Sequence, residues 1–390
     1  MINIRGAGPG NEAGSTPPRS PIARIGAALR GEGMHTRGLS SPLVTAGAIA
    51  AILASVIFFW SWRSGLDAGA SNPTWFAGYV DVTVSPPYAF EQASTPSTKD
   101  VVLAFIVASP DRPCAASWGT GYSLDEAGRV LGLDKRIAAL RSKGGSASVS
   151  FGGALNTELA SSCQDESQLR VAYRDVVERY DPAFIEFDLE DANLLDEAAG
   201  QRRAKAIAAL QGDRGTSGKK LGVWMTLPVT PRGLTDPGIT AINQMLEAGV
   251  DLAGVNIMTM NYGASRSGSQ TMSDAATAAA DATHDQLGIL YQRAGINLSS
   301  EQAWKKLGVT PMIGRNDLPG EFFDQDAARN LKDYALNRGI QRLSMWSLNR
   351  DVPCAPGANS DAASHICSGL DQGNTRFSEL LGGALPGRMG

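Results

Sequence analysis

The sequence predicts an α/β fold: a (β/α)₈ TIM barrel, preceded by a disordered N-terminal tail and one apolar anchor helix. From about residue 72 onward, short apolar runs alternate with longer segments of helical periodicity. This alternation is typical of repeated βα units around a parallel sheet. Because there are eight such runs, a closed barrel accounts for them better than an open, doubly wound sheet. The chain of 390 residues is long enough for one such domain and an appendage.

The predicted strands and helices follow one another along the chain. The strands are Phe76–Val82, Val101–Val107, Ser146–Phe151, Phe184–Leu189, Leu221–Leu227, Gly254–Met260, Leu307–Ile313 and Arg342–Ser347. The helices are Asp134–Ser142, Asp165–Tyr180, Leu195–Leu210, Pro237–Ala248, Ser273–Arg293 and Gln325–Asn337. Asp165 and Ser273 are the predicted N-caps of two helices, and Gly339 is a predicted stop for the last one. The barrel domain is therefore expected to occupy residues 72–385.

The N-terminal region has a different composition. Residues 1–40 are rich in Gly, Pro, Ser and Arg and lack apolar periodicity, so we expect a disordered cytoplasmic tail. Residues 43–62 carry no charge, and a stretch of about 20 apolar residues is what a helix needs to cross a bilayer. The preceding arginines predict a single-pass membrane anchor that places the barrel outside the cell. The alternative is a signal peptide cleaved near Ala70, which releases the barrel as a secreted protein.

The four cysteines, Cys114, Cys163, Cys354 and Cys367, all lie downstream of the apolar segment. Their position favours an oxidising compartment and two disulfides, for which three connectivities exist. We expect neighbours along the chain to pair, Cys114 with Cys163 and Cys354 with Cys367. The alternative is four free thiols buried in the core.

Charge and histidine usage argue against two classes of site. The net charge is −4, and the residues up to Arg37 carry a surplus of three positive charges, so the rest of the chain carries −7. A negatively charged barrel without a basic stripe is not expected to bind nucleic acid. The three histidines are scattered and the cysteines lack CxxC spacing, so we expect no metal site.

The fourth predicted strand ends in three acidic residues at every second position. Glu186, Asp188 and Glu190 share one face of a strand, and the apolar residues between them share the other. Barrel strands are buried on both faces and carry their sites at the C-terminal ends, so these carboxyl groups point into a confined interior. Their repulsion raises at least one pKa, which keeps an acid protonated near neutral pH. The alternative is an edge strand whose charges face water.

This motif resembles the DxxDxDxE signature of family 18 glycoside hydrolases, the chitinases and their relatives. Three other segments are similar to motifs of the same family, each at the end of the expected strand. Ser150-Phe-Gly-Gly153 is similar to SxGG, and Met258-Thr-Met-Asn-Tyr262 is similar to MxYD or MxMDY. Met345-Trp-Ser-Leu-Asn-Arg-Asp351 ends the eighth strand, where the family places a tryptophan beneath the sugar. The resemblance covers residues 75–370.

The resemblance implies a retaining hydrolysis in which the substrate's own acetamido oxygen attacks the sugar carbon. Glu190 is then the acid that protonates the leaving oxygen, and Asp188, with Glu186 beside it, orients the acetamido group. Trp346 offers an apolar face to the sugar. The full set of expected substrate-binding residues is Trp346, Tyr262, Asn261, Met260, Ser150, Gly152, Gly153 and Trp224. Trp118, Asn316 and Asp317 also lie beyond strand ends, where core packing or loop capping explains them equally well.

The chain departs from the family signature at several positions. The first Asp of the signature falls on Ala183 and the second on Glu186, which is one methylene longer and can still share a proton with Asp188. The tyrosine that holds the acetamido carbonyl aligns with Met260. Tyr262 lies two residues further on, so on a continuing strand it faces the same side and can take that role. Asn261 stands where many members have Asp.

We therefore expect a monomeric, cofactor-free hydrolase of β-1,4-linked N-acetylglucosamine polymers, with chitin or its oligosaccharides as partners. One alternative is a hydrolase of another N-acetylhexosamine glycan, such as an N-glycan core or peptidoglycan. Another is a chitinase-like lectin that binds sugar without cutting it, although lectins of this type usually lack the acid that Glu190 supplies.

Overall fold

The computed structural model describes residues 73–357 and 362–389, which belong to one compact unit of the chain. The predicted tail (1–40) and the predicted anchor (43–62) lie outside the described residues. Within the two described ranges, no helix combines the length and the apolar composition that a membrane span requires.

In the described part of the chain, parallel strands close into a barrel, and all eight predicted strands are present. The first strand is interrupted at Ala77, so that β1 pairs with β14 and β2 pairs with β3. The first strand therefore joins the last strand to the second and closes the ring. The barrel strands are β1 (Trp75–Phe76), β2 (Gly78–Asp81), β3 (Asp100–Ala108), β6 (Ser146–Gly152), β7 (Phe184–Asp188), β8 (Gly222–Thr230), β10 (Leu252–Met258), β11 (Leu307–Thr310) and β14 (Arg342–Leu343).

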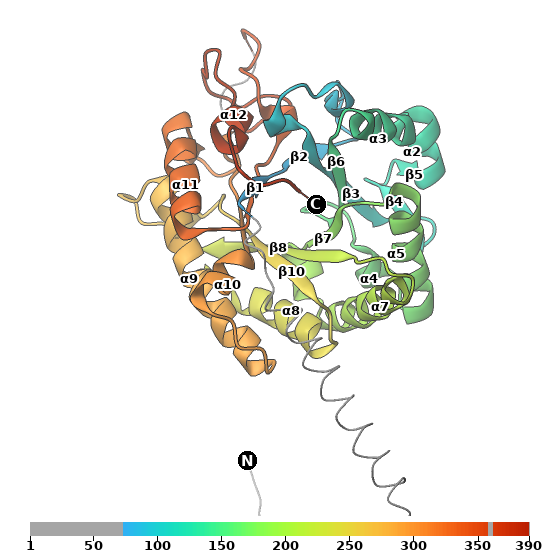
Figure 1. Ribbon diagram of the computed structural model, residues 1–390. Helices are drawn as coiled ribbons and strands as arrows, with labels where there is room; N and C mark the ends of the chain where they lie inside the picture. The colour runs from blue at the N-terminus through green and yellow to red at the C-terminus, as the bar shows by residue number, and fades with distance from the viewer. Residues whose placement is uncertain (1–72, 358–361, 390) are drawn as a thin grey trace, which may run out of the picture. The chain divides into compact units, whose positions relative to one another are not determined.

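Helices surround this ring of strands (Figure 1). They are α2 (Leu124–Val130), α3 (Leu133–Ser142), α4 (Leu159–Ser162), α5 (Glu166–Tyr180), α6 (Asp191–Leu195), α7 (Glu197–Thr216), α8 (Asp236–Glu247), α9 (Met272–Arg293), α10 (Ser300–Lys305), α11 (Gln325–Arg338) and α12 (Phe377–Gly382). The six predicted helices correspond to α3, α5, α7, α8, α9 and α11. The largest boundary difference is at α7, which continues beyond the predicted end at Leu210 to Thr216.

Two of the three predicted helix boundaries are confirmed. The Asp165 carboxylate accepts a hydrogen bond from the Gln168 amide at the start of α5, and Gly339 ends α11 at φ 74°. The prediction for α9 was wrong because Thr271, not Ser273, is the N-cap. The Thr271 hydroxyl accepts from the Asp274 amide, and the Asp274 carboxylate accepts from the Thr271 amide in return. This reciprocal pair satisfies two amides at once and starts the helix earlier.

The strands separate two apolar regions. On the outer face of β7, Ile185 and Phe187 pack in the core between sheet and helices, as the alternation predicted. Inside the barrel, near the N-terminal ends of the strands, Trp75 contacts Phe184 and Trp224 at ring-centroid distances of 5.7 and 5.8 Å. Met389 is buried in this inner cluster, so the C-terminal segment closes this end of the barrel. The polar interior side chains lie nearer the other end.

Short elements extend the loops around the barrel. They are the strands β4 (Ala116–Trp118), β5 (Tyr122–Ser123), β9 (Gly233–Leu234), β12 (Gly314–Arg315) and β13 (Phe322–Phe323), and the 3₁₀ helices η1 (Phe90–Gln92), η2 (Pro96–Thr98), η3 (Gly263–Ser265) and η4 (Leu348–Arg350). Two disulfides, Cys114–Cys163 and Cys354–Cys367, confirm the predicted pairing. The first joins the segment after β3 to the end of α4, and the second closes the segment after β14, so both restrain loops at the C-terminal ends of strands.

Candidate active site

A cavity of about 280 Å³ opens at the C-terminal ends of the barrel strands. Every barrel strand, or the loop that follows it, contributes to the lining. Acidic side chains dominate its charge: Asp81, Asp188, Glu190 and Asp317 all face it. This is the end of the barrel at which a (β/α)₈ enzyme builds its site.

Asp188 and Glu190 form a coupled pair of carboxyl groups in this cavity. Asp188 is the last residue of β7 and is 4% exposed, and Glu190 is the N-cap residue of α6. Burial raises the pKa of Asp188 well above its usual value, and the charges of Glu190 and Glu186 raise it further. Burial also raises the pKa of Glu190 to about 7, with the Asp191 charge as the next contribution. These raised pKa values favour a proton held by the pair near neutral pH.

Glu186 lies one layer deeper in the barrel and has a different partner from the one we expected. Its Oε2 accepts a hydrogen bond of 2.6 Å from Nη1 of Arg342, the first residue of β14, and both side chains are fully buried. Its Oε1 has no hydrogen-bond partner among the described residues. The motif predicted that Glu186 can share a proton with Asp188, but that prediction did not include Arg342 as a neighbouring cation.

A network of neutral polar side chains surrounds this ion pair. The Tyr79 hydroxyl lies 3.2 Å from Nη2 of Arg342, from the Thr226 hydroxyl and from the Asn256 amide nitrogen. The Thr310 hydroxyl donates to the Asn256 carbonyl oxygen at 2.8 Å. Side chains of β2, β8, β10, β11 and β14 thus form one continuous polar network beside Asp188, and Tyr79, Thr226 and Thr310 line the cavity with it.

The glycines after β6 allow this strand to approach Asp188 closely. A Cβ atom on Gly152 (φ 101°) would lie 2.1 Å from the backbone oxygen of Asp188, and one on Gly153 (φ 86°) would lie 2.8 Å from the Phe105 ring. The Gly153 amide donates to the same Asp188 oxygen at 2.9 Å. Only glycine fits both the backbone conformation and the space at these positions. Gly152 and Gly153 therefore position Asp188 and do not line the cavity.

Three of the expected sugar contacts do line the cavity. The Trp346 ring stacks on Phe105 at a centroid distance of 5.4 Å and meets Tyr79 edge-on at 5.9 Å. Met260 and Asn261 line the cavity after β10. Asn261 and Asp317 exchange two hydrogen bonds of 2.8 and 3.0 Å, which joins the loop after β10 to the loop after β11.

Tyr262, Ser150 and Trp224 do not line the cavity. Tyr262 is 5% exposed and packs in the outer core, because β10 ends at Met258 and Asn261 adopts φ 51°. The strand alternation on which its prediction rested has ended before this residue. Ser150 and Trp224 are buried in the interior, and Trp224 pairs in register with Glu186, one layer below the cavity.

Of the three other residues beyond strand ends, one lines the cavity and two are buried away from it. Asp317 faces the cavity, whereas Asn316 is buried and donates to the Met312 carbonyl. Trp118 is fully buried, and its indole NH donates to the Tyr180 hydroxyl at 2.9 Å. Core packing is therefore the role of Trp118.

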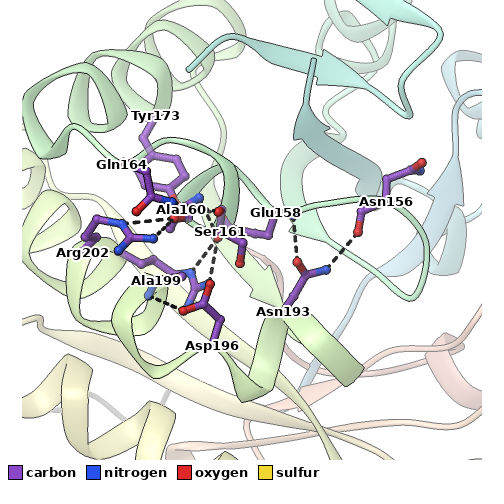
Figure 2. A network of polar contacts seen from close by, with 11 residues as sticks. Asn156, Glu158, Ala160, Ser161, Gln164, Tyr173, Asn193, Asp196, Ala199 and Arg202 are labelled. Atoms are coloured by element: carbon purple, nitrogen blue, oxygen red, sulfur yellow. Dashed lines mark hydrogen bonds and ion pairs between the residues drawn. The ribbon is translucent and has the colours of Figure 1, made fainter. Parts of the chain in front are cut away.

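A second buried carboxylate, which we did not predict, supports the loop after β6 (Figure 2). Glu158 accepts hydrogen bonds from the Tyr173 hydroxyl at 2.6 Å and from Arg203 at 2.8 Å. Asn193 accepts from the Glu158 amide at 3.0 Å and donates to the Asn156 carbonyl at 3.1 Å. Because Asn156 lines the cavity and the Asn193 amide donates to the Glu190 carbonyl, this network connects the cavity wall to the segment that carries Glu190.

Metal-ligating residue types do not cluster in the part of the chain that the structure describes. None of its His, Cys, Asp and Glu side chains form a group of three or more arranged to hold an ion.

Comparison with known proteins places the chain among glycosidases. A probable bifunctional chitinase/lysozyme of Escherichia coli K12 is 33% identical over 338 residues, covering 82% of this chain and 37% of that protein. Endochitinase 11 of Metarhizium anisopliae is 33% identical over 312 residues, covering 75% of this chain and 58% of that protein. The crystal structure of the catalytic domain of a hyperthermophilic chitinase from Pyrococcus furiosus aligns with a TM-score of 0.67 at 28% identity, covering 80% of this chain and 96% of that one.

The sequence and structural similarity to chitinases supports a family 18 glycoside hydrolase. No family model matches it. It spans 37% and 58% of the lengths of the two curated relatives, so their activities as whole proteins are not transferred to it.

The family 18 signature helps to explain the layering of the site. Asp188 and Glu190 hold the last two acidic positions of the signature, at the cavity. The first acidic position is Ala183, which packs against the inner apolar cluster. At the second, the longer Glu186 reaches the guanidinium of Arg342. The departures at Ala183 and Glu186 therefore lie below the cavity and leave the two carboxyl groups that face it, whereas those at Met260 and Asn261 line the cavity.

Proposed function

We propose that this protein hydrolyses β-1,4-linked N-acetylglucosamine polymers with retention of anomeric configuration, using the substrate's acetamido group as the nucleophile. The observation that carries the proposal is the Asp188–Glu190 pair, a proton-retaining pair of carboxyls in a cavity at the C-terminal end of the barrel. The chitinase names of the relatives favour the same substrate class.

Glu190 is the proposed general acid. With its pKa raised to about 7, a substantial fraction of the group is protonated at neutral pH, which a donor to a glycosidic oxygen requires. Its proton passes to the leaving oxygen as the C1–O bond breaks and the electron pair of that bond remains on the oxygen. The resulting carboxylate then removes a proton from the water that attacks C1.

Asp188 is the proposed partner of the acetamido group. When the acetamido oxygen attacks C1, its nitrogen acquires positive charge, and a buried carboxylate beside that nitrogen stabilises the charge strongly. Trp346 provides an apolar face for the same sugar ring, since it lines the cavity and is held against Phe105.

We further propose that the barrel works outside the cytoplasm as a monomer. The two disulfides favour an oxidising compartment. An anchor at residues 43–62 or cleavage near Ala70 remains the proposed route to that compartment.

The test is hydrolysis of chitin oligosaccharides by the full chain, compared with a Glu190→Gln variant. General acid–base catalysis contributes about 10²–10⁴-fold, so the variant should lose activity by at least about 100-fold while the parent releases the β-anomer first. Product chromatography and NMR of the first anomer released provide the measurements. Glu197→Gln, the same substitution at an exposed position of α7, is the matched control and should retain full activity.

The alternatives predict other outcomes. Binding of the oligosaccharides without cleavage by the parent identifies a lectin. Cleavage of peptidoglycan or N-glycan cores, with chitin oligosaccharides untouched, identifies a hydrolase of another glycan. Equal activity of parent and Glu190→Gln contradicts the assignment of the acid.

A further inference from the structure

Arg342 occupies an unusual position for a cation, in the middle of the barrel. It is fully buried and pairs with Glu186 at 2.6 Å, while its Nε donates to the Ser344 hydroxyl at 2.7 Å and its Nη2 to the Tyr79 hydroxyl at 3.2 Å. Four aromatic rings surround its guanidinium at 5.0–5.7 Å: Trp75, Tyr79, Phe184 and Trp224. Hydrogen bonds and ring faces together hold the charge in one place.

This arrangement determines the charge of Glu186. Removing a carboxylate from water costs several kcal/mol unless a counter-charge at hydrogen-bond distance offsets the loss. The direct contact with the Arg342 guanidinium provides that counter-charge for Glu186. An ionised group with a bound cation is a poor acceptor for a further proton.

Asp188 lies directly above, at the next inward position of β7. Its Oδ1 and the Oε1 of Glu186 are both buried without a hydrogen-bond partner among the described residues. Two neighbouring buried carboxyl groups can share a proton only when at least one of them is free to take it. Arg342 removes Glu186 from that exchange, and the remaining carboxyl in contact with Asp188 is Glu190.

We propose that Arg342 is a positioning residue for the proposed hydrolysis, on which this inference rests: it holds Glu186 as a carboxylate, so that Asp188 exchanges its proton with Glu190 alone. The proton moves from a carboxyl oxygen of Asp188 to one of Glu190, and the charge of the pair does not change. After transfer Glu190 is the neutral acid and Asp188 is the carboxylate that faces the acetamido nitrogen.

The other groups around Asp188 are consistent with this path. From β2, burial raises the pKa of the Tyr79 hydroxyl well above its usual value, so this group stays protonated. From β8 and β10, Thr226 and Asn256 do not titrate. The charges of Asp191 and Asp317 raise the pKa of Glu190. The other charged or titratable groups that line the cavity are Asp81, Arg350 and His365.

The experiment is a pair of single substitutions and their combination: Glu186→Gln, Arg342→Met and the double variant. Methionine is close to arginine in length and suits a pocket of aromatic rings. Carbon-13 labelling of the aspartate and glutamate carboxyls, with signals assigned from Asp188→Asn and Glu190→Gln, follows the titration of the pair by NMR in the full chain. This readout needs no catalysis, so it tests the inference even if the protein cuts none of the substrates offered. The pH dependence of kcat is measured beside it.

Opposite shifts are expected from the two single variants. Glu186→Gln leaves an unpaired cation near Asp188 and should lower the titration midpoint of the pair, and the alkaline limb of kcat, by about one pH unit. Arg342→Met leaves an unpaired carboxylate and should raise both. The double variant should return to within a few tenths of a unit of the parent, because both charges are absent.

A merely structural role gives another result. If the folded variants lose stability while the pair titrates as in the parent, the inference is wrong, and it is equally wrong if both single variants shift in the same direction. Should Arg342→Met fail to fold, Arg342→Lys keeps the charge and must leave the midpoint near the parent value, in contrast to Glu186→Gln. If the carboxyl pair titrates as predicted but the parent protein cleaves no glycan, the proposed function is wrong. The inference about the charge of Glu186 then still holds.

Discussion

Two buried glutamate–arginine pairs lie close to the same cavity, and they differ in how completely the carboxylate is bonded. Glu158 uses both oxygens: Oε1 accepts from Tyr173, and Oε2 accepts from Arg203 and from the Ala160 amide. Glu186 uses Oε2 for Arg342 and leaves Oε1 unpaired. Both side chains are fully buried.

We interpret the Glu158–Arg203 pair as structural and the Glu186–Arg342 pair as the one proposed to act on the catalytic carboxyl groups. A buried carboxylate whose two oxygens are both hydrogen-bonded stabilises the segments that supply its donors. Glu158 in this way connects the loop after β6 to α7 through Arg203. A carboxylate with one unpaired oxygen carries an unfavourable free-energy term of about 1–3 kcal/mol. Such terms are retained where the charge itself serves the chemistry.

The largest expected effect comes from breaking the structural pair. Arg203→Met leaves Glu158 buried without its counter-charge and should lower the free energy of unfolding by about 3–5 kcal/mol. Urea unfolding measures this loss. The folded fraction of Arg203→Met should show the same pH dependence of kcat as the parent. If its alkaline limb shifts as much as that of Glu186→Gln, the two pairs do not differ in the way proposed.

Glu190→Gln should stabilise the protein at the pH where it abolishes activity. The pKa of Glu190 is raised from 4.5 to about 7 in the folded protein, so the stability that this group contributes is present below pH 4.5 and is lost as the pH rises to 7. Glutamine has no charge to bury, and the variant should gain about 1–3 kcal/mol at pH 8, a figure reduced for partial exposure. At pH 4 the two proteins should unfold alike. Thermal unfolding at both pH values, with Glu197→Gln as control, tests this, and a gain of equal size at pH 4 would contradict it.

Asn193 connects the structural pair to the cavity, so its removal should affect both. Asn193→Ala loses the hydrogen bonds to Glu158 and Asn156 and should cost about 1–2 kcal/mol of stability. The loop that carries Asn156 is then less restrained, and KM for chitin oligosaccharides should rise a few-fold with the pH profile unchanged. Steady-state kinetics measure both quantities. Asn330→Ala, at an exposed position of α11, is the control and should change neither.

The smallest expected effect concerns the charge beside the acid. Asp191 adopts φ 41°, a conformation that asparagine also tolerates, so Asp191→Asn removes the charge without straining the backbone. Because the Asp191 charge raises the pKa of Glu190, its loss should lower that pKa and move the alkaline limb of kcat down by a few tenths of a pH unit. An upward shift would contradict the direction, and Asp236→Asn, exposed on α8, should have no effect.

Much of the fold and part of the site were predictable from local patterns. Eight apolar runs that alternate with helical segments predict the barrel because each βα unit must bury one strand and one helix face. The spacing of Asp188 and Glu190 predicts their position because a strand alternates its side chains. The four cysteines predicted both disulfides from their order along the chain.

The remaining features depend on depth in the barrel and on distant partners, which local patterns do not contain. Alternation assigns a residue to the inner face but not to a layer, and Trp224 therefore lies below the cavity instead of lining it. Tyr262 was misplaced because the strand ends at Met258, before the turn that redirects the chain. Arg342 begins a short apolar run, and its partner Glu186 lies 156 positions earlier in the chain. A periodic pattern along the sequence contains no information about a cation that aromatic rings from four other strands, β1, β2, β7 and β8, surround.

The way the ring closes has a consequence for biosynthesis. The first strand contributes β1 to the last strand and β2 to the second, so neither edge of the sheet is covered until Arg342–Leu343 has left the ribosome. At about 5–20 residues per second, the chain between these strands takes roughly 15–50 s to make. During that interval the nascent sheet presents unpaired edge strands, which are templates for association with other chains. Production of this protein should therefore depend on chaperones that shield the nascent chain, and a translational pause just before the last strand should be more harmful than one after it.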